Sequence, residues 1–223
     1  MANNEVKLSR GGAPAVEAVV VEGLTCQRGG RPVVSDVSFK VEAGTALALR
    51  GPNGSGKTTL LRTLAGYLQP AAGTIEVKRP AGAGVGDDGA YHYIGHANGI
   101  KPRLTVIENV SFWQRYYGGA EDIEAAEDAL EAFNLLNLAS FNAGHLSQGQ
   151  TRRLGLARLL AARRPVWLLD EPQAALDTDS TRLLEKAIAA HLSLSGIAIV
   201  STHLDLALPG AQVLELGASR VNQ

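Results

Sequence analysis

The stretch GPNGSGKTT, Gly51–Thr59, fits the pattern G-x-x-x-x-G-K-[ST]. The apolar run TALALRG that leads into it is typical of a buried strand, and the residues from Thr58 to Leu68 have a helical pattern. Glycines allow the backbone to turn so that several N–H groups point at phosphate oxygens, and the positive end of the helix dipole faces the same point. The stretch therefore predicts a phosphate-binding loop between a strand and a helix.

The side chains at the end of this loop have distinct predicted roles. Lys57 supplies a positive charge for the β- and γ-phosphates of a nucleotide, and the Thr58 hydroxyl is placed to bind Mg²⁺. The predicted nucleotide-binding residues of the loop are Gly51, Pro52, Asn53, Gly54, Ser55, Gly56, Lys57, Thr58 and Thr59.

A second motif, VWLLDEP at Val166–Pro172, is an apolar strand that ends in two carboxylates. Asp170 is predicted to hold Mg²⁺ through water, and Glu171 is placed to act as a general base on an attacking water molecule. Alone, the motif would be a strand end with two solvated acids. Together with the phosphate-binding loop it predicts a site that hydrolyses a nucleotide.

The order of the segments predicts an α/β fold. Short β-rich runs from 18 to 49 predict a small antiparallel sheet, whereas the last third of the chain alternates strands and helices, as mostly parallel sheets do. Apolar spacings of three and four residues predict helices between about 106 and 138. Polar residues 1–14 are expected to form a disordered tail, followed by one domain over 15–223 with a helical subdomain at about 97–160.

The composition excludes several classes of protein. The net charge of -1 gives no electrostatic indication of a nucleic-acid partner, and the single cysteine, Cys26, excludes an internal disulfide framework. The first residues lack the apolar run of a signal peptide, and no apolar run approaches the roughly 18–20 residues that span a bilayer. We therefore expect a cytoplasmic protein that reaches a membrane only through a partner.

The stretch LSQGQTRRLGLARLL decides among kinases, GTPases and other proteins with these two motifs. A Leu-Ser-x-Gly-Gln sequence that opens a helix shortly before the carboxylate strand resembles the signature motif of ATP-binding cassette (ABC) proteins. A serine hydroxyl, a glycine and a helix N-terminus suit a second phosphate-binding surface, although a plain serine N-cap would use the same residues. The residues of this signature are Leu146, Ser147, Gln148, Gly149 and Gln150.

Further motifs extend the resemblance to ABC proteins over about residues 16–217. Asp177 in AALD matches the loop that communicates between subunits, and His203 in STH matches the switch histidine near the γ-phosphate. The resemblance implies a P-loop NTPase (RecA-like) core with a small N-terminal antiparallel sheet and an inserted helical signature subdomain. It also implies ATP and Mg²⁺ as cofactors and a head-to-tail homodimer, in which the signature of one copy acts in trans on the ATP of the other.

Two positions depart from the usual ABC pattern. His96 stands where most ABC proteins carry the Q-loop glutamine, which reaches Mg²⁺ and the attacking water, and we expect His96 to do the same. Arg28 replaces the aromatic residue on which adenine usually stacks. A guanidinium can stack on a base, so Arg28 is a predicted ATP contact, although a solvated turn residue fits equally well.

The segment GHANGIKPRLTVIENVSF around His96 resembles that of the CcmA family, the ATP-binding subunits of the cytochrome c maturation haem exporter, and so does the start LTCQRGGRPVVSDVSF. This resemblance implies a peripheral ATPase on the cytoplasmic face of the inner membrane, which drives CcmB/CcmC-like permease subunits in haem export. Two alternatives remain open: the ATPase of a lipid or drug exporter, and a soluble ABC ATPase that acts on DNA or ribosomes.

Two further features are interpreted as structural. Aromatic residues at helical spacing in FWQRYY, Phe112–Tyr117, favour a core position over a groove for a membrane partner's helix. A basic stripe favours a solvated helix face over a surface that binds nucleic acid or lipid. Its residues are Arg152, Arg153, Arg158, Arg163 and Arg164.

Overall fold

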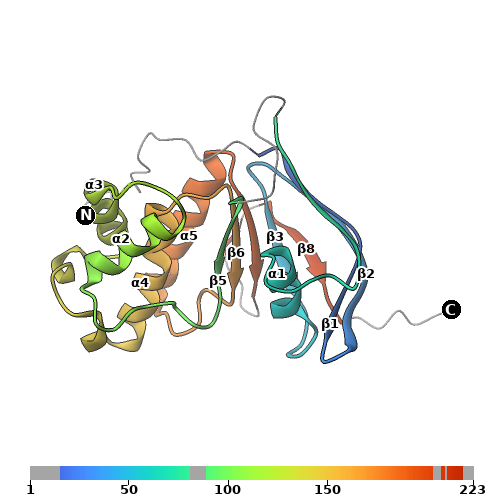
Figure 1. Cartoon of the computed structure of the whole chain (residues 1–223), viewed down its shortest axis with the longest axis horizontal. Helices are drawn as coiled ribbons and strands as arrows, with labels where there is room; N and C mark the ends of the chain where they lie inside the picture. Colours follow the sequence, from blue (N-terminus) through green and yellow to red (C-terminus); the bar gives the residue numbers. More distant parts are fainter. Residues whose placement is uncertain (1–15, 81–88, 203–206, 209, 218–223) are drawn as a thin grey trace.

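A computed structural model describes residues 16–80, 89–202, 207–208 and 210–217, which form two sheets with helices between and beside them (Figure 1). The strands are β1 (Ala18–Arg28), β2 (Arg31–Glu42), β3 (Ala46–Arg50), β4 (Ala72–Lys78), β5 (Tyr91–Ile94), β6 (Val166–Asp170), β7 (Ile197–Ser201) and β8 (Gln212–Glu215). The helices are α1 (Lys57–Leu64), α2 (Val106–Tyr116), α3 (Ile123–Ala132), α4 (Gln148–Ala161) and α5 (Thr178–Ser193), with short 3₁₀ turns η1 (Leu136–Leu138) and η2 (Ala143–His145). The expected tail, 1–14, lies outside the described residues.

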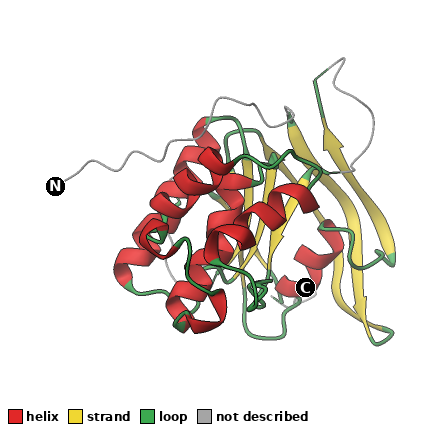
Figure 2. Cartoon of the chain, turned by 60° about the vertical axis from the view of Figure 1, so that its left-hand side comes forward, coloured by secondary structure: helices red, strands yellow, loops and turns green. Residues whose placement is uncertain are grey.

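The larger sheet has five parallel strands in the order β5-β6-β7-β3-β8, and the smaller has the antiparallel order β2-β1-β4. The prediction of a mostly parallel α/β core with a small antiparallel sheet is therefore confirmed. In two views related by a turn of 60°, most helices gather on one side of the parallel sheet and the antiparallel sheet lies on the other (Figures 1 and 2). Both faces of β3, β6 and β7 are covered, which explains why these strands are mostly apolar, whereas the edge strand β8 is largely exposed.

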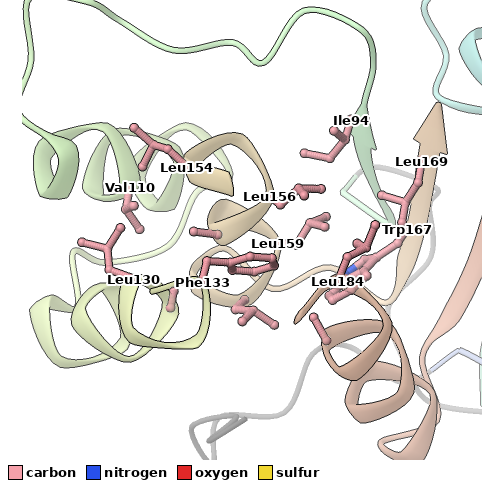
Figure 3. Close-up of a cluster of buried hydrophobic side chains, with 14 of the residues drawn as sticks. Ile94, Val110, Leu130, Phe133, Leu154, Leu156, Leu159, Trp167, Leu169 and Leu184 are labelled. Carbon is pink, nitrogen blue, oxygen red and sulfur yellow. The ribbon is translucent and has the colours of Figure 1, made fainter. Parts of the chain in front are cut away.

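Strand β6 shows how the alternation of side chains divides the core. Trp167 and Leu169 pack into a cluster with α3, α4 and α5, where Phe133, Leu156 and Leu184 lie (Figure 3). Successive residues of a strand point to opposite faces. The alternate residues of β6 therefore join a second cluster, with α1 and the antiparallel sheet, whose members include Val166, Leu168, Leu60, Leu61, Val19 and Leu24.

The predicted helix over residues 58–68 ends earlier than expected, at Leu64. Gly66 adopts φ +78, its N–H donates to Thr63 O at 3.1 Å, and the Tyr67 N–H donates to Arg62 O at 2.9 Å. This pair of bonds around a left-handed glycine is a Schellman motif, which satisfies the last carbonyls of the helix and stops it. The helical pattern predicted for 106–138 is present as α2, α3 and η1.

The interpretation of the basic stripe as a solvated helix face is wrong for Arg152 and Arg158, which are 3% and 4% exposed. Backbone carbonyl groups in β5, in the segment that follows β5 and in the turn after β6 accept hydrogen bonds from these two side chains. The charge of an arginine predicts a solvent-exposed side chain, but a guanidinium that is surrounded by neutral hydrogen-bond acceptors can be buried. None of the described helices is long and apolar enough to cross a membrane.

Two histidines are buried beside the parallel sheet. The ring of His191 stacks on Trp167 with centroids 3.9 Å apart, and its Nε2 lies 3.2 Å from Ile197 O. Burial lowers the pKa of His191 to about 4, and burial together with the charge of Arg158 lowers the pKa of His92 well below its usual value. Both side chains are therefore neutral in the folded protein at neutral pH.

We expect acid to destabilise the fold through these two histidines. In the unfolded chain a histidine has a pKa of about 6.5, so below this pH it binds a proton that the buried ring does not bind in the folded chain. The free energy of unfolding therefore falls as the pH decreases from about 6.5 toward about 4. Each unit of pKa difference corresponds to about 1.4 kcal/mol. Urea unfolding followed by circular dichroism at about pH 7.5 and about pH 5 measures this loss.

His191→Phe keeps a ring on Trp167 but removes the titrating group, so its loss of stability between the two pH values should be smaller than that of the wild type. His145→Phe, at an exposed position, is the matched control and should lose as much as the wild type. Equal losses in all three proteins would contradict the role given to His191.

Candidate functional site

The loop between β3 and α1 can be built only with glycine at two positions. Gly51 has φ +136 and Gly56 has φ +99, values that other residues rarely adopt. A Cβ at Gly51 would collide with Leu216 O, and a Cβ at Gly56 would lie 2.5 Å from Val34 Cγ2. The loop therefore turns tightly between the sheet and the β1–β2 hairpin and leads directly into the first turn of α1.

Lys57 begins α1 and folds back into the loop. Its Nζ donates to Gly51 O at 2.7 Å and to Pro52 O at 3.1 Å, and the residue is 6% exposed. The buried Ser55 hydroxyl has no hydrogen-bond partner within the described part of the chain. A concave loop with an ammonium group, an unbonded hydroxyl and a helix N-terminus is suited to an anion with several oxygens.

Asp170, at the end of β6, is the centre of a polar network and is 1% exposed. Its Oδ1 accepts hydrogen bonds from Thr58 Oγ1 at 3.1 Å and from Ser201 Oγ at 2.8 Å. Its Oδ2 accepts a bond from Tyr93 OH at 3.4 Å and lies 3.7 Å from His96 Nε2. Four segments that are far apart in the sequence, those around residues 58, 93–96, 170 and 201, therefore meet at this carboxylate.

Glu171 follows directly and has φ +46, a left-handed conformation that is strained for a residue with a side chain. Its N–H donates to both the carbonyl oxygen and the hydroxyl of Ser201, at 3.2 and 3.0 Å. These bonds turn the chain out of the sheet at this residue, and the Glu171 side chain lines a cavity beside Thr58. Observed strain of this kind is typical of functional sites.

The cavity has a volume of about 370 Å³ and runs from the end of β6 to the β1–β2 hairpin. It brings together residues that the sequence predicted separately: one from the hairpin, most of the phosphate-binding loop, the Q-loop position and the second carboxylate. The lining residues are Arg28, Val33, Asn53, Gly54, Gly56, Lys57, Thr58, Thr59, His96 and Glu171.

The signature residues do not line this cavity. Ser147 is exposed and caps α4 in a reciprocal pair, in which its Oγ accepts from Gln150 N at 3.3 Å and Gln150 Oε1 accepts from Ser147 N at 2.8 Å. A Cβ at Gly149 would lie 3.5 Å from Ala175 O. Asp177 caps α5 through Ser180 N at 2.7 Å, and hydrogen bonds from the side chain and then the backbone of Ser180 lower the pKa of Asp177.

One predicted site residue, His203, lies outside the described residues. Others were missed: Tyr93, Ser201 and Val33 were not predicted, yet they contact Asp170 or line the cavity. The signal for the first two was their place at the carboxyl ends of strands that flank β6, where a parallel sheet gathers its functional side chains.

A second hollow, of about 490 Å³, lies between the end of α1 and the end of α2. Tyr67, Tyr91, Tyr116 and Tyr117 line it together with Arg164, and we call it the tyrosine groove. Tyr67 and Tyr116 are 59% and 61% exposed. Of the aromatic residues in FWQRYY, Phe112, Trp113 and Tyr117 are half-buried and Tyr116 is exposed, so the interpretation of these aromatic residues as core is wrong for Tyr116.

Comparisons with known proteins agree with this geometry. Residues 34–174 match the model of the family described as ABC transporter. The chain is 50% identical over 205 residues to "Cytochrome c biogenesis ATP-binding export protein CcmA" of Paracoccus denitrificans, covering 92% of this chain and 91% of that protein. It is 44% identical over 201 residues to the protein of the same name from Rhizobium meliloti, covering 89% and 97%.

A solved structure is similar over nearly the same length. It is a putative ABC transporter ATP-binding protein from Pyrococcus furiosus, with 29% identity and a TM-score of 0.78, covering 90% of this chain and 98% of that one. A phosphate-binding loop, a buried carboxylate network and a helix with an exposed signature serine thus occur in a chain that matches these relatives over 89–92% of its length. The chain belongs to the ABC transporter family, as an ATP-binding subunit of the CcmA group.

Proposed function

We propose that this chain hydrolyses ATP as a homodimer bound to membrane permease subunits, and that the permease exports or handles haem for the maturation of c-type cytochromes. The observation that carries the ATPase is the meeting of Thr58, Tyr93, His96 and Ser201 at the buried Asp170 carboxylate, with Glu171 one residue away. The relatives are named as cytochrome c biogenesis ATP-binding export proteins, and this name supports the transport role. The GHANGIK segment supports the assignment to haem.

The phosphate-binding loop would hold the β- and γ-phosphates of ATP. Lys57 Nζ lies within the loop, and exchange of its bonds to Gly51 O and Pro52 O for phosphate oxygens would keep its charge paired. Arg28 and Val33, from the β1–β2 hairpin, line the same cavity, and the adenine ring would lie against them. The Arg28 guanidinium can stack on adenine in place of an aromatic ring.

Thr58 Oγ1 and Asp170 Oδ1 suit Mg²⁺, because this ion prefers oxygen ligands and is usually bound by one or two protein oxygens with phosphates and waters. The two oxygens are 3.1 Å apart. The described residues contain no group of three or more His, Cys, Asp or Glu side chains that could hold a metal, so Mg²⁺ is expected to bind together with the nucleotide. When bound, it would neutralise charge on the transferred phosphoryl group.

Glu171 is the proposed general base. Glu171 lines the cavity together with Thr58, and its carboxylate would accept a proton there from a water molecule that attacks the γ-phosphate. His96, whose side chain is 56% exposed, would orient the same water as the Q-loop glutamine does in other ABC proteins. His203, outside the described residues, remains the proposed partner of the γ-phosphate.

The exposed signature supports a dimer. Ser147 and Gly149 do not line the cavity of their own chain, so a second copy is needed to bring them to a bound ATP. A head-to-tail pair is two-fold symmetric, and the same contact completes both sites. ATP would favour the closed pair because it contacts both copies, and its hydrolysis would remove those contacts.

The tyrosine groove is the proposed contact with the membrane partner. Exposed tyrosines and an arginine in a concave surface suit a short amphipathic helix, since aromatic rings and Arg are enriched where proteins bind one another. Tyr93, which precedes the His96 segment, packs on Tyr67 of this groove with ring centroids 5.5 Å apart. CcmB/CcmC-like subunits would thereby hold this chain at the cytoplasmic face of the inner membrane.

Glu171→Gln should bind ATP with nearly wild-type affinity, hydrolyse it at least about a hundredfold more slowly, and accumulate as a dimer. The amide keeps the size of the side chain but cannot accept the proton. Phosphate release and light scattering with and without ATP measure both effects. Turnover within a few-fold of the wild type would remove Glu171 from its proposed role.

Mixing two inactive variants tests whether the signature acts in trans. Lys57→Ala loses its own ATP site and Ser147→Arg blocks the signature, so each protein alone should be inactive. In a mixed dimer, Lys57 of one copy meets Ser147 of the other and one site is intact. An equal mixture should therefore recover up to about a quarter of wild-type activity by random pairing. If the mixture stays inactive at every ratio, the signature does not act across copies.

Co-purification tests the haem assignment. Tagged Glu171→Gln is isolated from native membranes with ATP, and its integral partners and absorbance spectrum are determined. We expect CcmB/CcmC-like subunits and a haem Soret band, both lost in the Glu171→Gln, Lys57→Ala control, which cannot hold ATP. A different permease without haem would leave the ATPase intact and overturn the haem assignment.

A further inference from the structure

The buried guanidinium of Arg152, on α4, uses all its donors. An arginine side chain has five N–H groups in a planar fork. The five acceptors are Pro172 O at 3.0 Å from Nε, Gly95 O and Asn98 Oδ1 at 2.9 and 2.8 Å from one terminal nitrogen, and Glu171 O and Asp170 O at 2.9 and 3.5 Å from the other.

These acceptors come from the two loops that carry the proposed chemistry. Gly95 and Asn98 lie on either side of His96, and the remaining carbonyls belong to residues 170–172, with Glu171 at their centre. The loops follow the neighbouring parallel strands β5 and β6. One side chain thus ties both loops to the same helix.

Glu171 needs such support because its backbone is strained. At φ +46 the residue persists only if neighbouring groups hold both of its peptide groups in place. Ser201 holds the N–H, and the carbonyl oxygen accepts hydrogen bonds from Arg152 at 2.9 Å and from Ala174 N at 3.1 Å. The direction of the Glu171 side chain therefore depends on Arg152 as well as on the sheet.

Close packing also holds the loop that carries His96 against α4. Gly155, one turn after Arg152, lies under Asn98, and a Cβ there would be 3.1 Å from Asn98 Cβ. Arg158 donates to Asn98 O at 3.1 Å and to Tyr93 O at 3.0 Å, and its guanidinium lies 4.1 Å from the centroid of the Trp113 ring. The His96 loop is therefore attached to α4 at several points.

We propose that Arg152 is a positioning residue that joins the signature helix to the His96 and Glu171 loops, so that docking of Ser147 on the second copy's ATP aligns the general base in this copy's own site. The inference rests on the proposed function, because it needs the signature to act in trans. Ser147 and Arg152 lie on one rigid helix, about one and a half turns apart. A displacement of the helix N-terminus is thus passed to both loops.

A lysine would keep the charge but not the connection, since it has three donors on one nitrogen and cannot reach two loops in a fixed plane. Arg152→Lys is therefore the informative variant, and Arg153→Lys is its matched control. Arg153 lies on the same helix but donates to Phe133 O and Asn134 O, away from the cavity. Asn98→Ala is a milder variant that removes one acceptor and leaves the bond from Arg158 to the Asn98 backbone.

We expect Arg152→Lys to lower kcat at least about tenfold and Asn98→Ala about threefold, with KM for ATP within about twofold of the wild type, because misalignment of a base costs rate but not binding. Arg153→Lys should keep both constants within about twofold. Combined with Glu171→Gln, Arg152→Lys should still form the ATP-bound dimer, since Lys57 and Ser147 are unchanged. Melting temperatures identify any variant that is misfolded.

If Arg152→Lys does not fold, Asn98→Ala decides. A kcat in both variants within about twofold of Arg153→Lys would overturn the proposal, and so would a loss explained by a higher KM or by failure to dimerise. Failure of the proposed function itself appears elsewhere, as normal hydrolysis by Glu171→Gln or as a mixture of Lys57→Ala and Ser147→Arg that stays inactive.

Discussion

The structure depends on one buried carboxylate. Asp170 lies at the carboxyl end of β6 and is almost inaccessible to water. Its charge is tolerated only because hydroxyl groups from other segments donate hydrogen bonds to it. Thr58 brings the start of α1, Ser201 brings the end of β7, and Tyr93 brings the end of β5. The bonds that satisfy this carboxylate therefore also bring together the phosphate-binding loop, Glu171 and the His96 loop.

The sheet determines where that assembly can form. Because β6 has apolar residues on both faces, it must lie inside a layered core, and only the carboxyl end of the strand can present polar groups to solvent. Parallel neighbours present their own ends at the same edge. The chemistry is thus concentrated at one edge by the burial of β6 and its neighbours, while α4 and α1 pack on opposite faces and reach that edge from two directions.

Much of this could be predicted from the sequence. The phosphate-binding loop and the carboxylate strand have local patterns whose residue types follow from phosphate and metal chemistry, and the fold class follows from the alternation of strands and helices. Arg152 could not be predicted, because its pattern is that of a surface charge and its role depends on carbonyl groups far away in the sequence. The prediction for Tyr116 was wrong in the opposite direction. The spacing of the aromatic residues indicates burial, but this side chain is exposed.

A single copy contains the cavity and the signature, but the signature residues do not line the cavity. The cavity has the loop, the carboxylates and His96, whereas the capped N-terminus of α4 faces outward. In the capping box the Ser147 hydroxyl accepts a hydrogen bond from Gln150 N at 3.3 Å. This bond is long and lies at an exposed helix end, so exchanging it for a bond to a phosphate oxygen would cost little. The same helix is fastened within its own chain by Arg152. A contact made by one copy would therefore act on its own carboxylates, and a symmetric pair would complete both sites in one step.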